Sequence, residues 1–130
     1  MIRYDSPLIG QTFTLEKLRD RLAELGFYLN ETFSSHFGAF DCALEKSQSS
    51  YDYYLRLTVS TVKGFLDAPD SIVKIEEIYA IGARYHHGFQ EDLAIPRPLQ
   101  EKAQTIVDRL PKHLSVNDPN TTNAQASVSM

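Results

Sequence analysis

The segment Tyr53-Tyr54-Leu55-Arg56-Leu57-Thr58-Val59-Ser60 shows the clearest β-strand pattern of the chain. Its odd-numbered residues are mostly apolar and fall on one face, while Arg56 and its even-numbered neighbours fall on the other. Such alternation indicates a strand that is buried on one face. Val62 breaks the alternation, which predicts a bulge or a strand end near Thr61.

Other strands are expected on both sides of this segment. Apolar and polar residues alternate after Gly26 and again over residues 40–45, and an apolar strand pattern resumes over residues 72–75. Residues 78–89 are ambiguous, because their composition suits either a strand end or a short helix that Gly82 would weaken.

A helix is predicted over residues 14–25. Thr14 can cap its first turn, and Gly26 stands where a helix end favours a left-handed residue. One face carries the apolar stripe Leu15, Leu18, Leu22 and Leu25.

A second helix is predicted over residues 98–110. It follows Pro96-Arg97-Pro98, and Pro111 is expected to end it because proline removes a backbone donor. Its apolar stripe is Leu99, Ala103, Ile106, Val107 and Leu110.

These elements predict an α+β fold, with an antiparallel sheet of four to five strands and both amphipathic helices packed on one face. The opposite face would present Tyr54 and Arg56 as its solvated side. Residues 1–114 form a single domain in this interpretation. Residues 115–130 form an unstructured tail, because they offer little to bury.

Composition excludes several functional classes. With 130 residues, a formal charge of -4 and a pI near 5.5, the chain lacks the positive field that nucleic-acid binding requires. No apolar run approaches the roughly 20 residues needed to cross a bilayer. The single Cys42 and the absence of an apolar run resembling a signal peptide predict a cytoplasmic protein, and we expect neither a cofactor nor a metal.

Several short stretches resemble the YugN-like proteins of bacteria. They are Leu25-Gly26-Phe27, His36-Phe37-Gly38-Ala39-Phe40-Asp41, Tyr54-Leu55-Arg56-Leu57, Val62-Lys63-Gly64-Phe65-Leu66-Asp67, and the segment from Ala83 to Asp92. The resemblance spans roughly residues 1–110 and implies a single small α+β domain, but it implies no activity, catalytic residue or cofactor. An extra residue between His36 and Phe40 departs from the family pattern and is interpreted as a local bulge.

Titratable and aromatic side chains are concentrated over residues 78–92, so a functional site is expected there. We interpret the chain as a non-catalytic module that binds a protein or a small acidic ligand, with self-association as a further expectation. The predicted binding residues are Arg56, Arg84, Tyr85, His86, His87 and Asp92.

Two alternatives stay open for the same segment. In one, the chain is a small hydrolase or a metal-dependent enzyme that uses His86, His87 and Asp92, although adjacent histidines on a strand point to opposite faces and cannot chelate one ion well. In the other, Tyr85 and Phe89 pack the second helix onto the sheet and the histidines cap a turn.

Overall fold

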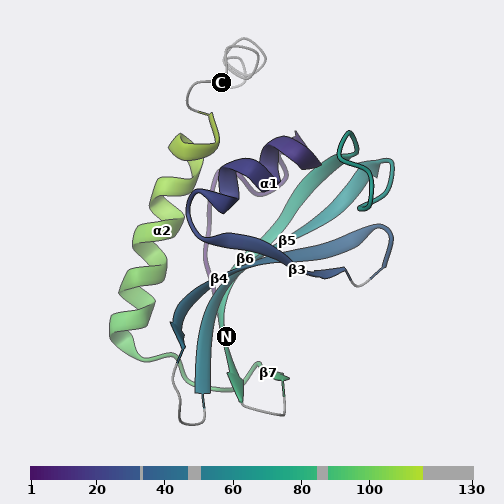
Figure 1. The fold of residues 1–130 in the computed structure, drawn as a ribbon. Coiled ribbons are helices and arrows are strands. Elements are labelled where there is room, and N and C mark those ends of the chain that lie inside the picture. Colours follow the sequence, from purple (N-terminus) through teal and green to yellow (C-terminus); the bar gives the residue numbers. More distant parts are fainter. Residues whose placement is uncertain (33, 47–50, 85–87, 116–130) are drawn as a thin grey trace.

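Two helices and seven strands make up the described part of the chain, which comprises residues 1–32, 34–46, 51–84 and 88–115 of a computed structural model (Figure 1). In chain order they are β1 (Ile2–Arg3), β2 (Thr12–Thr14), α1 (Leu15–Ala23), β3 (Phe27–Thr32), β4 (Phe37–Lys46), β5 (Tyr51–Lys63), β6 (Ile72–Arg84), β7 (Gly88–Gln90) and α2 (Arg97–Ser115). The α+β class is confirmed. The prediction of four to five strands is too low.

All strand pairs are antiparallel, and the main path through the sheet is β1-β6-β5-β4-β3. Three short strands share the edge of β6 that faces away from β5. β2 pairs with residues 72–74, β1 with residues 79–80, and β7 with residues 82–84. Strands of two or three residues are too short to show alternation, which is why the sequence pattern missed them.

The register lines up side chains in rows across the sheet. On the face that packs against the helices, Phe27, Cys42, Leu55 and Ala80 stand opposite one another on consecutive strands. All four belong to the buried core, which both helices join through their apolar stripes. Packing of both helices on one face of the sheet is thus as the sequence predicts.

The start of α1 has the expected cap. The Thr14 hydroxyl accepts a hydrogen bond from the Lys17 backbone N–H at 3.3 Å, and this satisfies one of the donors that a helix start leaves free. Gly26, which follows the helix, has φ of 91°, a value that side chains with a Cβ rarely adopt.

Helix α2 continues through Pro111 to Ser115, so the prediction that Pro111 ends it is wrong. Leu110 and Leu114 flank the proline and are 0% and 1% exposed. Their burial holds the last turn against the core and offsets the backbone hydrogen bond that proline cannot make. The predicted tail lies outside the described residues from position 116 onward, and Ser115 belongs to the helix.

The ambiguous stretch is largely resolved as strand, since residues 78–84 belong to β6 and residues 88–90 form β7. A register shift between Thr61 and Lys63 confirms the predicted irregularity near Thr61. The bulge expected between residues 36 and 40 is not there. The register shift lies instead on the partner strand β3, between Leu29 and Glu31.

Candidate binding surface

The face of the sheet opposite the two helices, hereafter the open face, carries one continuous row of side chains. Tyr28 of β3, Asp41 of β4, Arg56 of β5 and Tyr79 of β6 are successive register partners. They alternate with the buried core positions along each strand, so the row points away from α1 and α2.

The centre of this row is a buried ion pair. Arg56 Nε lies 2.8 Å from Asp41 Oδ1 and Nη2 lies 2.9 Å from Oδ2, an arrangement that matches the two oxygens of the carboxylate to the fork of the guanidinium. Asp41 is 0% and Arg56 4% exposed. Asn30 also donates from Nδ2 to Asp41 Oδ2 at 2.6 Å.

The interpretation of Tyr54 and Arg56 as a solvated surface is therefore wrong for Arg56. A lone arginine on that face would be expected to reach water, but the register places Asp41 directly opposite it and aromatic side chains surround the pair. Loss of water around the charges is compensated by their mutual hydrogen bonds.

Phe89 forms part of the cover over Arg56. Its ring centroid lies 4.0 Å from Arg56 Cζ and 5.7 Å from the ring centroid of Tyr54, which it meets edge to face. Phe89 comes from β7, on the opposite side of β6 from β5, so its ring reaches across β6. Phe89 thus packs on the open face and does not pack α2 onto the sheet.

Two tyrosines of the open face, Tyr54 and Tyr79, have pKa values raised above the usual value of a phenol. Burial raises the pKa of Tyr79, while the charge of Arg56 and a hydrogen bond with it act in the opposite direction. Burial also raises the pKa of Tyr54, and the neighbouring Asp52 adds to this effect. At neutral pH both phenols are protonated and can donate hydrogen bonds.

The other predicted site residues do not share this environment. Arg84 is exposed at the end of β6, where its register partners are Tyr51 and Gly88. Asp92 is exposed in the turn that follows β7. Residues 85–87, which include the predicted Tyr85, His86 and His87, lie outside the described residues, so the hydrolase and metal hypotheses stay predictions.

The described residues contain no group of three or more His, Cys, Asp or Glu side chains placed to hold a metal ion. Cys42 is 6% exposed, and burial raises the pKa of its thiol although Lys102 acts in the opposite direction. A protonated, buried thiol is a poor nucleophile.

The sequence pattern does not identify Asp41, Asn30, Tyr28 and Tyr79 as companions of Arg56. A usable signal was present, because Asp41 and Arg56 both occupy the polar phase of neighbouring strands and carry opposite charges. Pairing them requires the register, which the sequence pattern does not supply.

Large apolar side chains are also exposed near one end of β4 and β5. Phe37, Val62 and Phe65 are 55%, 60% and 52% exposed. Phe37 is opposite Ser60 on β5, and the ring of Phe65 packs against His36 with the centroids 5.1 Å apart. Grouped apolar side chains of this kind mark interaction surfaces more often than isolated ones.

Comparison with known proteins supports the fold and assigns no activity. Neither α1 nor α2, the helices of the described part, is long and apolar enough to cross a membrane. The chain is similar to the crystal structure of an uncharacterised conserved protein, YugN from Geobacillus kaustophilus HTA426, with a TM-score of 0.75 and 21% sequence identity, covering 88% of this chain and 95% of that one. No match was found among curated proteins. A model of the YugN-like family matches residues 3–118, and the chain therefore belongs to the YugN-like family.

Proposed function

We propose that the chain is a non-catalytic, cytoplasmic interaction module that binds a protein through the open face. One observation carries this proposal: the helix-free face of the sheet presents partly exposed aromatic rings around an ion pair whose charges cancel. A sheet face that only meets water ordinarily carries polar side chains. The centres of protein interfaces are instead enriched in Tyr, Phe and Arg and poor in uncompensated charge.

The contacts that Arg56 already makes favour a protein partner over a small acidic ligand. Two of its nitrogens already donate to Asp41, and Phe89 covers its guanidinium plane. An acidic ligand would have to displace Asp41 and leave that carboxylate buried without its partner, which is costly. A protein surface can bind the rings around the pair without breaking it.

The open face also has side chains exposed enough to anchor a partner. Tyr28 is 44% exposed, and Phe37, which follows the same strand phase as Asp41, is 55% exposed. A second copy of the chain is the first partner to test. In a two-fold interface the same surface of each copy meets itself. Two open faces could meet in this way, because the charges at the centre of each one are neutralised.

The test uses a Tyr28→Ser/Phe37→Ser double variant, which removes two exposed rings and leaves the ion pair in place. The control is Ile9→Ser, which removes an apolar side chain of similar exposure, 40%, from the turn between β1 and β2. Sedimentation velocity over a range of concentrations measures self-association. Capture from an extract of the source organism, followed by binding measurements with each purified candidate, tests other partners.

Loss of association in the double variant, with Ile9→Ser unchanged, would support the proposal. The proposal fails if the wild-type chain stays monomeric and every purified candidate binds the double variant at least as tightly as the wild-type chain.

A further inference from the structure

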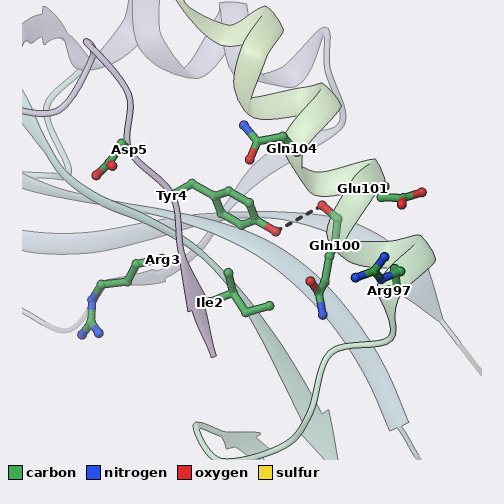
Figure 2. Close-up of a pocket in the computed structure, with 8 residues that line it drawn as sticks. All are labelled: Ile2, Arg3, Tyr4, Asp5, Arg97, Gln100, Glu101 and Gln104. Carbon is green, nitrogen blue, oxygen red and sulfur yellow. Dashed lines mark hydrogen bonds between the residues drawn. The ribbon is translucent and has the colours of Figure 1, made fainter.

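A second surface of the molecule is hollow. A groove of about 600 Å³ lies between the N-terminal segment that contains β1 and the first turns of α2 (Figure 2). Its lining residues are Ile2, Arg3, Tyr4, Asp5, Arg97, Gln100, Glu101 and Gln104. Arg3 is the register partner of Tyr79 and extends to the open face, whereas Ile2, Tyr4 and the residues of α2 line the groove from the opposite side, so the groove does not depend on the proposed function.

The strand wall of the groove is apolar where it faces α2. Ile2 and Tyr4 point towards α2, whereas Arg3 and Asp5 extend to the other side of the strand (Figure 2). Tyr4 is 8% exposed, and its hydroxyl donates to the backbone oxygen of Gln100 at 3.2 Å, which joins the two walls. Arg3 forms an ion pair with Glu77, since its Nε lies 3.0 Å from Glu77 Oε2.

The helix wall is polar. Arg97, Gln100, Glu101 and Gln104 recur at intervals of three and four residues and so share one side of α2. Arg97, Gln100 and Gln104 extend towards the strand, and Glu101 points away from it (Figure 2). Among the described residues, Arg97 has no ion pair.

The two glutamines present acceptors to the groove. Gln100 Nε2 donates to the backbone oxygen of Ile95 at 2.8 Å, and Gln104 Nε2 donates to Asp108 Oδ1 at 2.9 Å. These bonds orient each amide and leave its oxygen to accept from a ligand. Within the described residues, the groove therefore combines a guanidinium that has no ion pair with two amide oxygens. Gln100 and Gln104 lie about 4.5 and 10.5 Å from Arg97 along the helix axis.

We infer that this groove binds the carboxylate end of a short peptide or a similar amide-containing carboxylate. The carboxylate pairs with Arg97, whose planar fork suits its two oxygens. The N–H groups that precede the carboxylate in such a ligand donate to Gln100 and Gln104. A small apolar side chain rests against Ile2 and Tyr4.

The experiment uses the full chain, isotopically labelled for two-dimensional NMR, with the dipeptide alanylalanine as the probe. Saturable shifts at residues 2–5 and 97–104 are expected. Removing the ligand's carboxylate, in alanylalanine amide, should abolish them. Arg97→Gln should weaken binding about ten-fold or more, because it removes a charge-assisted hydrogen bond. Gln104→Leu should weaken binding of the dipeptide but not of acetate.

Arg109→Gln is the matched control, since it removes an exposed charge from the same helix outside the groove. It should leave binding unchanged. The inference is overturned if the dipeptide gives no saturable shifts, if the shifts fall on other residues, or if acetate binds as tightly as the dipeptide. Free peptide and a protein C-terminus share this chemistry, and a longer peptide with the same last two residues distinguishes them: equal affinity indicates a small-molecule site, and tighter binding indicates a protein C-terminus.

Discussion

Asp41 and Arg56 face each other across β4 and β5 as a doubly hydrogen-bonded ion pair that is almost completely removed from water. Their side chains lie on the face of the sheet that carries no helix. This pair fixes the centre of the open face, and the aromatic residues of three further strands surround it.

Removing one member of this pair should destabilise the fold strongly. Arg56→Ala leaves the Asp41 carboxylate buried without its cation, so the free energy of unfolding should fall by about 3–5 kcal/mol. Urea denaturation followed by circular dichroism measures this. The double variant Asp41→Leu/Arg56→Met removes both charges and should recover most of the loss. A single variant within 1 kcal/mol of wild type would contradict the burial of the pair.

Gly82 should be sensitive to the smallest side chain. A Cβ at this position would clash with Leu93 Cδ2 and would lie 3.2 Å from Tyr53 Cε1. Gly82→Ala should therefore lower the free energy of unfolding by about 1–3 kcal/mol through overpacking. In a double-mutant cycle, Leu93→Ala should cancel part of this cost. Strictly additive effects would mean that the two residues are not in contact.

The stability of the chain should fall at alkaline pH. Burial raises the pKa of Cys42 above 9.0 and the pKa values of Tyr4, Tyr54 and Tyr79 above 10.0. Above these values the unfolded chain loses protons that the folded chain retains, so the folded state binds more protons and stability decreases as pH rises. The stabilisation that these protonated groups give the folded state is fully present below about pH 9 and is lost as the pH rises further.

Urea denaturation at intervals from neutral pH to pH 11 would show the decline. Tyr79→Phe removes one of the responsible groups and should flatten the curve above pH 10. An unchanged slope in Tyr79→Phe would show that Tyr79 does not contribute.

Thr14→Ala should lower the free energy of unfolding by about 1 kcal/mol, because the Lys17 N–H loses its acceptor at the start of α1. Thr14→Ser retains a hydroxyl and should stay close to wild type. The comparison of the two variants in thermal or urea denaturation separates capping from side-chain packing. Equal losses in both would assign the effect to the methyl group of Thr14.

Sequence patterns predicted the elements whose signal is local. The Thr14 cap, the alternation of residues 53–60 and the two apolar helix stripes each depend on neighbours within one or two turns. Pro111 also gave a local signal, but the burial of Leu110 and Leu114 overrode it.

The centre of the open face depends on residues that are distant in the sequence. Asp41 and Arg56 are 15 positions apart, and Phe89 reaches them from a three-residue strand. Neither the register nor such a short strand leaves a periodic pattern, so the sequence indicates Arg56 as a binding residue but does not predict its burial. The predicted binding residues at 85–87 are outside the described chain, and their role stays a prediction.

The three short strands along β6 have a consequence for assembly. A sheet can grow by adding strands at either edge, and stacking in both directions leads to fibres. Here β1, β2 and β7 occupy successive parts of one edge, so within the described residues the main path ends with β3 as its other outer strand. Edge-to-edge addition through β3 would stop once two copies had met, because among the described strands longer than three residues only β3 leaves one edge unpaired.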